Sequence, residues 1–432
     1  VERMGYLFPI RKGQFPGKLL FSILLTFYDT LAGIRTHGWH NADAVSQKAP
    51  GIRRNGLKGA NYYTDAVTVD ARLVLRVLQQ ACAEGGQVLN YARATDLMRD
   101  SRGQVNGVVV QDTLSGESVS LQASVVINAT GAWVDELREK ITHERTIRPL
   151  RGSHIIIPAQ RLPVQEALTL FHPADKRATF IFPWEGFTVI GTTDLDHAPA
   201  LNLEPGITRN EVDYLLQLAN DQFPDVKLTD ADIISTYAGV RPVISKDRNK
   251  DPSKEKRDHK VWVDQGLVSV SGGKLTTFRL IARDTLNAAK AFLPGLQFPN
   301  TDEQVFAASR VTPDQLCNID RDQATLLLGR YGNEAPALLQ QASADECRPI
   351  DGTRWCLAEL RWSCRNEQIV HLDDLLLRRS RLGLLLKDGG AQLFPALKSL
   401  CQQELGWNDA QWQAELQRYQ DLWRTYYSLP RG

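Results

Sequence analysis

The stretch LVSVSGGKLTTFR, residues 267–279, constrains the fold of this chain more than any other part of the sequence. Its first residues alternate as in a β-strand, the strand stops at Gly272 and Gly273, and an amphipathic helical pattern follows in residues 274–293. A glycine pair at a strand-to-helix junction lets the backbone come very close to a ligand. The successive N–H groups there, together with Lys274, favour a partly negative atom. We expect a phosphate or the negative edge of a reduced flavin ring at this junction; a glycine loop with a surface lysine is the alternative.

A second junction of the same kind occurs at VVINATGAW, residues 125–133. The unbroken apolar run at its start is typical of a strand covered on both faces, as in a parallel sheet. The strand stops at Ala129, Thr130 and Gly131, small residues of the sort that let a nucleotide approach the carboxyl edge of a doubly wound sheet. A tight strand-to-helix turn without a ligand would use the same residues.

Pattern changes along the chain predict several domains, as expected for 432 residues. Strands and helices alternate first, short strands with turns dominate next, and helices follow the Pro-containing segment LPGLQFPNTDEQ. We therefore predict a first α/β domain, an inserted α+β domain, a return to the first domain and a helical domain. Their predicted limits are 1–147, 148–264, 265–295 and 302–432.

Composition excludes several classes of protein. Lys and Arg number 51 against 50 for Asp and Glu, so the balance does not favour nucleic acid as a partner. The six cysteines include no CxxC pair, which fits a reducing compartment. Cys347, Cys356 and Cys364 with His371 match no zinc spacing, so we expect packing residues and no metal.

The longest apolar run, residues 19–28, is shorter than the ~20 residues that span a bilayer. The surrounding segment, 11–35, has basic residues on both sides of an apolar helical pattern. Such a helix either lies on an anionic lipid surface or packs on its own protein.

Two residues of the inserted domain are candidates for a site. His154 lies in the apolar strand pattern RGSHIIIP, where a lone histidine is more often a satisfied core residue than a catalyst. Arg241, in YAGVRPV, follows a Gly-Val pair and precedes a proline. Burying its guanidinium requires an anionic partner, so we expect a carboxylate or a bound phosphate beside it.

Taken in order, six motifs resemble the FAD-dependent, aerobic glycerol-3-phosphate dehydrogenases of the D-amino-acid-oxidase-like flavoprotein superfamily. The motifs are GANYYTDAVTVDARLV, INATGAW, RGSHIIIP, VIGTTD, YAGVRPV and SGGKLTTFR. The C-terminal stretch AELRWSCRNEQIVHLDDLLLRRSRLG resembles the helical cap of the same enzymes. The resemblance implies an α/β fold: a Rossmann-like FAD-binding domain, here incomplete, with an inserted α+β substrate domain and a C-terminal all-α cap domain.

The resemblance also implies where FAD would lie. The glycine-rich loop would face the isoalloxazine ring, the second junction would lie along the cofactor, and the strand YARATDL would pass near the adenine. The cofactor residues implied in this way are Gly272, Gly273, Lys274, Leu275, Thr276, Thr277, Thr130, Gly131 and Ala94.

The chemistry implied is the oxidation of sn-glycerol 3-phosphate to dihydroxyacetone phosphate, with a quinone as electron acceptor. Hydride transfer from C2 to the flavin needs a base for the hydroxyl proton, and His154 is the candidate. Arg241 and Arg257 would hold the substrate phosphate, and Lys274 would stabilise the developing alkoxide or the reduced flavin. Arg257 matches the family through little more than the tripeptide RDH, and a solvated charge run is the alternative.

The sequence departs from the family at its beginning. It contains no G-x-G-x-x-G motif, and the start VERMGYLFPIRKGQFPG resembles a stretch downstream of that unit. We therefore expect an N-terminally incomplete member that binds FAD weakly by itself, because the pyrophosphate lacks its glycine turn. The alternatives are a 2-hydroxyacid or amino-acid oxidase of the same superfamily, and a non-catalytic remnant. We expect a cytoplasmic protein with peripheral contact to lipid on the inner face of the cytoplasmic membrane.

Overall fold

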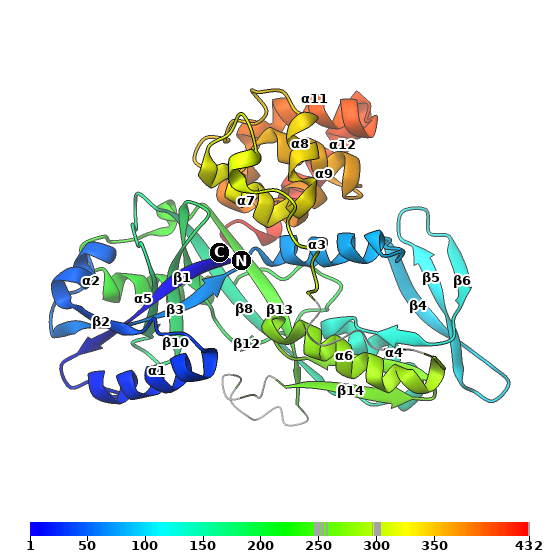
Figure 1. Cartoon of the computed structure of the whole chain (residues 1–432), viewed down its shortest axis with the longest axis horizontal. Helices are drawn as coiled ribbons and strands as arrows, with labels where there is room; N and C mark the ends of the chain where they lie inside the picture. Colours follow the sequence, from blue (N-terminus) through cyan, green and yellow to red (C-terminus); the bar gives the residue numbers. More distant parts are fainter. Residues whose placement is uncertain (246–251, 253–254, 256–257, 296, 298–303, 431–432) are drawn as a thin grey trace.

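The computed structural model describes residues 1–245, 252, 255, 258–295, 297 and 304–430. Figure 1 shows a large sheet with its helices on the left, two smaller sheets with helices on the right, and a helical domain above both. The inserted and first domains thus lie side by side, with the C-terminal domain packed over them.

The large sheet has nine strands, in the order β12-β8-β11-β10-β9-β1-β3-β2, and β13 pairs with β8. Its pairs are antiparallel except β1 with β9. The strands are β1 (Glu2–Arg11), β2 (Gly38–Asn41), β3 (Leu57–Val67), β8 (Ile147–Pro158), β9 (Ala167–Phe171), β10 (Ala178–Trp184), β11 (Phe187–Gly191), β12 (Leu195–Asp196) and β13 (Ser235–Ile244).

Strand β8 is buried on both faces, which explains its unbroken apolar run. Ile155 and Ile157 point into a core that includes residues of α5 (Arg209–Gln222) and α2 (Ala42–Lys48). Ile156, between them, points into the core of the helical domain. Side chains of a strand alternate between faces, so this one strand joins two cores.

The strands of residues 2–67 belong to the large sheet and pair with strands of the inserted domain. The first domain expected over residues 1–147 is therefore divided between sheets. Pairing of β1 with β9 joins positions about 160 residues apart in sequence, a contact that the local pattern does not encode.

The first-domain part contains two three-stranded sheets. In one, β15 runs parallel to β7 and antiparallel to β14, so residues 259–272 form a sheet with residues 126–128. The other is an antiparallel meander. Their strands are β14 (His259–Asp264), β15 (Leu267–Gly272), β7 (Val126–Asn128), β4 (Ala92–Arg99), β5 (Val105–Asp112) and β6 (Ser118–Gln122), and the helices of this part are α3 (Asp70–Ala83), α4 (Val134–Thr142) and α6 (Phe278–Ala289).

The helical domain surrounds a core of leucines and aromatic side chains, with Trp355, Trp412 and Tyr419 fully buried. Cys347, Cys356, Cys364 and Cys401 are also buried in apolar clusters, as expected for packing residues. The helices are α7 (Arg321–Tyr331), α8 (Ala335–Gln340), α9 (Leu357–Asn366), a π-helix (Asp374–Arg379), α10 (Leu382–Leu385), α11 (Phe394–Leu405) and α12 (Asp409–Tyr426).

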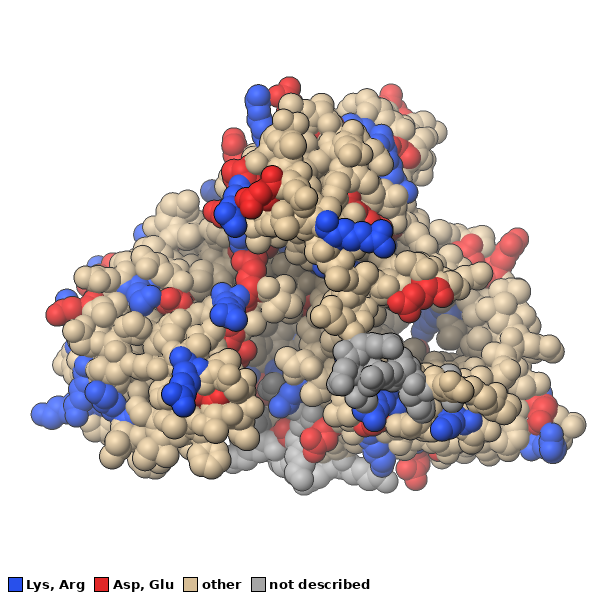
Figure 2. All heavy atoms as spheres, viewed as in Figure 1, with Lys and Arg blue, Asp and Glu red and all other residues tan. Residues whose placement is uncertain are grey.

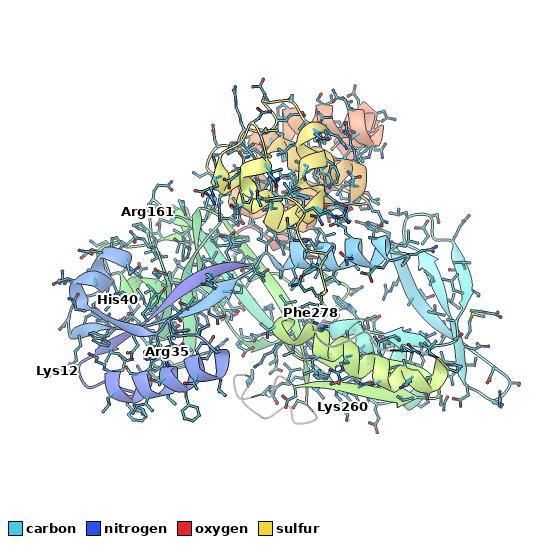
Figure 3. The ribbon with its side chains drawn as sticks, viewed as in Figure 1. Lys12, Arg35, His40, Arg161, Lys260 and Phe278 are labelled. Atoms are coloured by element: carbon cyan, nitrogen blue, oxygen red, sulfur yellow. The ribbon has the colours of Figure 1, made fainter. Side chains whose placement is uncertain are left out.

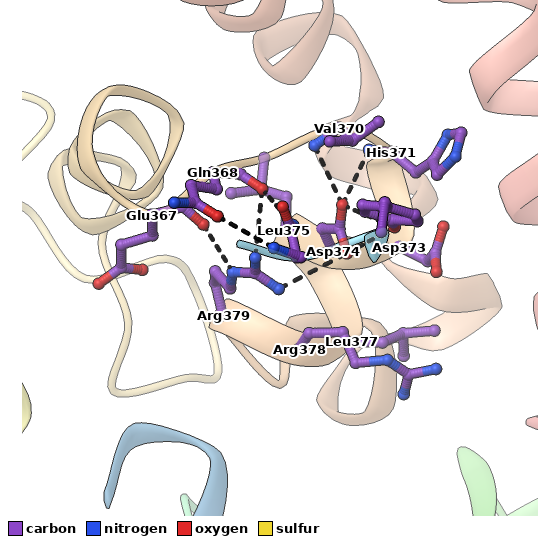
Figure 4. A network of polar contacts seen from close by, with 12 residues as sticks. Glu367, Gln368, Val370, His371, Asp373, Asp374, Leu375, Leu377, Arg378 and Arg379 are labelled. Atoms are coloured by element: carbon purple, nitrogen blue, oxygen red, sulfur yellow. Dashed lines mark hydrogen bonds and ion pairs between the residues drawn. The ribbon is translucent and has the colours of Figure 1, made fainter. Parts of the chain in front are cut away.

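Asp374, at the start of the π-helix, ties this domain to the first domain (Figure 4). Its carboxylate accepts hydrogen bonds from the backbone N–H of Val370 and of His371, at 3.0 and 2.9 Å, and lies 3.5 Å from the guanidinium of Arg379. The hydroxyl of Tyr91, just before β4, donates to the same carboxylate at 3.0 Å.

Buried ion pairs also connect the helical domain to the inserted domain and to the first domain. Arg330 of α7 bonds Glu359 of α9 and Glu185 of the β10–β11 turn, each at 2.8 Å. Arg72 of α3 bonds Glu367 at 2.8 Å, and both side chains are almost fully buried. Removing one partner of such a pair leaves an uncompensated charge and costs about 3–5 kcal/mol, so these pairs fix the helical domain on its base.

Candidate active site

The two glycine junctions lie next to each other at one edge of the small parallel sheet. β15 and β7 pair with Leu267 opposite Val126 and Ser269 opposite Asn128. Both strands therefore end at the same edge, and the Ser271 hydroxyl donates a hydrogen bond to the Gly131 carbonyl at 3.0 Å. The structure thus joins the two stretches that the sequence analysis selected separately.

The backbone at both junctions requires glycine. Gly131, Gly272 and Gly273 have φ angles of 61°, 80° and 85°, in the left-handed region. A Cβ on Gly272 would lie 2.6 Å from the Asp258 carbonyl oxygen, and one on Gly273 would lie 2.5 Å from Ile281. A Cβ on Gly131 would meet nothing within 4 Å, so this turn faces open space.

The chain after Gly273 is open on its outer side. Residues Leu275–Thr277 form a 3-10 turn, and α6 begins only at Phe278, later than the sequence pattern indicated; Figure 3 labels Phe278 at this end of α6. Lys274, Leu275 and Thr276 are exposed. Trp133, in the turn after Gly131, is also 43 % exposed. The junctions therefore present backbone, a lysine and apolar side chains to one open surface.

This surface fits the isoalloxazine end of FAD, since a flat aromatic ring with a negative edge requires close backbone approach, apolar cover and a cation. Thr130 is held by a 2.7 Å hydrogen bond from its hydroxyl to Asn128. Ala94 of β4 packs against a small core with Leu97 and Leu137, in the same part of the fold. Because the sequence has no G-x-G-x-x-G turn, no donors for the pyrophosphate are identified.

The imidazole of His154 is half-buried and lies in an unusual environment. Its ring stacks on Tyr237 of β13 at 4.5 Å between centroids, with an angle of 6° between the planes. Its Nδ1 atom is buried and has no hydrogen-bond partner. Burial, and then the charge of Arg241, lowers the pKa of His154 to about 4. The ring is therefore neutral at neutral pH, and its unpaired Nδ1 distinguishes it from the satisfied core histidine that was the alternative.

Gly191 makes room for this ring. It lies opposite His154 in the β11–β8 pair, and a Cβ there would lie 2.1 Å from the imidazole Cδ2. A side chain at position 191 would therefore displace His154. The motif VIGTTD supplies this glycine, although the sequence pattern gave it no role in the site.

Arg241 has the anionic partner that the sequence analysis expected. Its guanidinium donates to the Asp194 carboxylate at 3.0 Å, and Asp194 is almost fully buried. Arg177 approaches the same carboxylate at 3.8 Å and donates to the Thr192 carbonyl at 3.1 Å. The side chain of Arg241 remains 32 % exposed, so it is held in place and still faces outward.

Strand β13 connects this pair to the glycine junctions. It carries Tyr237 and Arg241, packs against β15 and against the turn at residues 131–133, and places Ile244 beside Gly272. The structure thus brings His154, Arg241 and the glycine loops into one region of the molecule. Arg257, the fourth catalytic candidate, lies outside the described residues.

Glu211 holds residues next to His154 and Asp194 in place, and the sequence analysis did not select it. Its buried carboxylate accepts hydrogen bonds from the hydroxyls of Ser153 and Thr193, at 2.8 and 2.7 Å, and from Arg151 at 2.7 Å. Ser153 precedes His154 and Thr193 precedes Asp194, so one carboxylate fixes both neighbours. Glu211 also closes the capping box of α5 with Thr208. The pattern TRNE before an apolar run is the signal that points to it.

Burial alone would raise the pKa of Glu211, but hydrogen bonds from Thr193, Thr208 and Ser153 outweigh it and lower that pKa. The carboxylate is therefore charged at neutral pH and balances the guanidinium of Arg151.

Comparison with known proteins agrees with this geometry. Residues 22–288 match the family model described as FAD dependent oxidoreductase, and residues 286–412 match the C-terminal domain of alpha-glycerophosphate oxidase. The fold and the loops at its sheet edge therefore define a flavin-dependent oxidoreductase.

Individual relatives identify the family within the class of flavin-dependent oxidoreductases. The aerobic glycerol-3-phosphate dehydrogenase of Staphylococcus haemolyticus is 33 % identical over 399 residues, which cover 87 % of this chain and 71 % of the relative. The Staphylococcus aureus enzyme of the same name is 32 % identical over the same coverage. The structure of the Bacillus halodurans glycerol-3-phosphate dehydrogenase complexed with FAD superposes with a TM-score of 0.76 at 26 % identity, covering 97 % of this chain and 82 % of that one. This chain belongs to the family of FAD-dependent glycerol-3-phosphate dehydrogenases.

Proposed function

We propose that this chain oxidises sn-glycerol 3-phosphate to dihydroxyacetone phosphate with FAD as cofactor and a quinone as electron acceptor. The observation that carries the proposal is the convergence of two elements. The linked glycine junctions offer an open, cationic surface for a flavin, and β13 connects them to a neutral, half-buried histidine beside a fixed arginine. Both are needed to oxidise a phosphorylated alcohol.

His154 is the proposed general base. When bound, FAD accepts the hydride that leaves C2 of the substrate. The hydroxyl proton must leave at the same time, and a base for it must be unprotonated. His154 meets this condition because its pKa is lowered to about 4. Its Nδ1 is buried, so Nε2 is the atom proposed to accept the proton.

Arg241 is the proposed anchor for the substrate phosphate. Its guanidinium is oriented by Asp194, and its outward part has N–H groups that suit a phosphate oxygen. Lys274, exposed at the glycine junction, is proposed to stabilise the alkoxide or the reduced flavin. The role of Arg257 as a second contact to the substrate phosphate remains a prediction.

We also propose that the chain meets its quinone at a lipid surface on the cytoplasmic side of the membrane, since such quinones reside in bilayers. In the described part of the chain, no helix combines the length and the apolar character needed to cross a bilayer. Contact with lipid would therefore be peripheral for these residues.

Flavin reduction tests the proposed reaction. The purified chain is supplied with FAD and mixed anaerobically with sn-glycerol 3-phosphate, and loss of the oxidised flavin band is followed. We expect bleaching by this substrate and slow or absent bleaching with 2-hydroxyacids or amino acids. His154→Asn should slow the reduction, and Arg241→Met should weaken substrate binding. Rapid reduction by a 2-hydroxyacid but not by glycerol 3-phosphate would favour the alternative oxidase.

A further inference from the structure

The side chain of Tyr237 covers one face of the His154 ring. Strand β13 pairs with β8 so that Tyr237 lies directly opposite His154, and the stacked rings are 4.5 Å apart and almost parallel. On the other side of β8, the residue opposite His154 is Gly191 of β11. Glycine has no side chain that could hold the imidazole there. Of the two cross-strand neighbours it is therefore Tyr237 that restricts the ring, as directly opposite side chains in a sheet do.

Within the described part of the chain, no hydrogen bond at Nδ1 fixes the imidazole of His154. A histidine that acts as a base usually has its tautomer and orientation set by a hydrogen bond at its second nitrogen. Arg241 is the charged group that affects His154, and a guanidinium cannot accept such a bond. The orientation of the ring therefore depends on packing, and the side chain stacked on it is that of Tyr237.

The helical domain holds the part of β13 that carries Tyr237. The hydroxyl of Ser235 donates to the Leu384 carbonyl of α10 at 2.5 Å, and the backbone N–H of Thr236 donates to the Tyr427 carbonyl at 2.8 Å. Both donor residues are buried, so water does not compete for these bonds. The two residues before Tyr237 are thus fixed to the helical domain as well as to β8.

The ring of Tyr237 also contacts the helical domain directly. It packs against the hydrophobic cluster that contains Leu384 and most of the helical-domain core. The guanidinium of Arg381, in the helical domain, bonds Asp70 at the start of α3 at 2.8 Å. Burial raises the pKa of Tyr237, and the charges of Arg381 and Asp70 then shift it in opposite directions, so this ion pair lies near the phenol. In Figure 2 the atoms of the helical domain rest directly on the parts of the chain below them, with spheres of both charges along the junction. Tyr237 thus lies between His154 and the helical domain.

We infer that Tyr237 is a positioning residue through which the helical domain sets the orientation of His154, with Nδ1 turned inward and Nε2 toward the substrate. In Figure 1, β8 and β13 run side by side beneath the helical domain. The inference rests on the proposed role of His154 as the base, and it gives the helical domain a part in that reaction. A small shift of this domain would move the imidazole and change the rate without changing the contact between Arg241 and the substrate phosphate.

Titration of the His154 imidazole by NMR tests the inference without flavin or substrate. The chain is isotopically labelled in its histidines, and the His154 signal is assigned by its absence in His154→Asn. In the wild type this signal should not shift with pH above about 5, because the pKa of His154 is about 4. Tyr237→Leu removes the stacked ring, so water should reach the imidazole and its pKa should rise to between about 5 and 6.5. Tyr237→Phe keeps the ring and should titrate like the wild type.

Ser235→Ala tests the part played by the helical domain, because it removes the hydroxyl that bonds the Leu384 carbonyl. Its matched control is Ser380→Ala. The Ser380 hydroxyl is also buried and donates to a backbone carbonyl, at 2.7 Å, but that carbonyl belongs to the helical domain itself. We expect Ser235→Ala to raise the pKa of His154 in the same direction as Tyr237→Leu, and Ser380→Ala to leave it unchanged.

Steady-state kinetics with FAD in excess provide the second readout. Tyr237→Leu should lower kcat about tenfold to a hundredfold, because a displaced base slows proton removal. It should change KM for sn-glycerol 3-phosphate by less than about threefold, because no substrate contact is removed. Tyr237→Phe should stay within about threefold of the wild type in both constants.

Three results would overturn the inference. One is an unchanged His154 titration in Tyr237→Leu, and another is equal shifts in Ser235→Ala and Ser380→Ala. The third is an equal loss of kcat in Tyr237→Phe and Tyr237→Leu, since the hydroxyl of Tyr237 would then act on the substrate itself. Because the titration needs neither FAD nor substrate, its result is independent of whether the proposed reaction takes place.

Discussion

Replacing Glu211 by glutamine should destabilise the inserted domain by about 3–5 kcal/mol. The Glu211 carboxylate is 2 % exposed and lies 2.7 Å from the Arg151 guanidinium, which is 9 % exposed. A glutamine keeps the shape but removes the charge, so Arg151 would remain buried without compensation. The amide can still turn its oxygen toward Arg151 and Thr208, and its NH2 group toward the hydroxyls of Ser153 and Thr193, which can rotate to accept. The loss of charge is therefore the main effect.

Equilibrium unfolding in urea, followed by tryptophan fluorescence, measures the change. Asp213→Asn is the matched control, because Asp213 lies on the same helix and pairs with Arg209 at an exposed position. Exposed pairs of this type contribute about 0–1 kcal/mol. We expect a clear shift of the transition for Glu211→Gln and almost none for Asp213→Asn. Equal shifts would refute the assignment of Glu211 as the charge that balances Arg151.

Further predictions concern the site itself. The pKa of His154 falls from 6.5 in the unfolded chain to about 4 in the folded one, so the folded state binds fewer protons. The free energy of unfolding should therefore decrease as the pH drops from about 6.5 to about 4. His154→Asn should remove up to about 3 kcal/mol of this pH dependence, measured by unfolding at several pH values. Gly191→Ala should move the imidazole and lower kcat by about a hundredfold in steady-state assays, whereas Gly206→Ala, whose Cβ meets only ordinary contacts, should not. Asp194→Asn should raise KM for glycerol 3-phosphate roughly tenfold or more with a smaller change in kcat, because Arg241 loses a charge-assisted bond; an unchanged KM would contradict its positioning role.

The local parts of the site could be predicted from the sequence. The pattern LVSVSGG marks β15, and its glycines have the left-handed backbone that a close approach requires. The apolar run before Asn128 predicted a strand of a parallel sheet covered on both faces. β7 does pair in parallel with β15, but it is not covered on both faces, since Ile127 is 39 % exposed. The need of Arg241 for an anionic partner was also readable, since a half-buried guanidinium requires one.

The remaining features depend on contacts between distant segments. No local pattern reveals that Asp194 is the partner of Arg241, that Gly191 faces His154, or that β1 pairs with β9. Each of these contacts joins residues about 40 or more positions apart. The predicted boundary at residue 147 does not separate the large sheet from the two small ones, because pairing between distant strands places residues on both sides of that boundary in the large sheet.

The helical signal after Gly273 also illustrates the limits of periodicity. Residues 274–293 have the spacing of one amphipathic helix, but the structure places a 3-10 turn at Leu275–Thr277 and begins α6 at Phe278. The positive φ angles of Gly272 and Gly273 redirect the chain, so several residues pass before a regular helix forms.

The most direct test of the central claim is the visible spectrum of the purified chain after addition of FAD and then of sn-glycerol 3-phosphate without oxygen. Because the sequence contains no G-x-G-x-x-G turn for the pyrophosphate, the account predicts weak binding that requires excess FAD. The bound flavin should bleach with this substrate, and the bleaching should slow in His154→Asn. A chain that remains folded but binds no flavin, or a bound flavin that glycerol 3-phosphate does not reduce, would contradict the account.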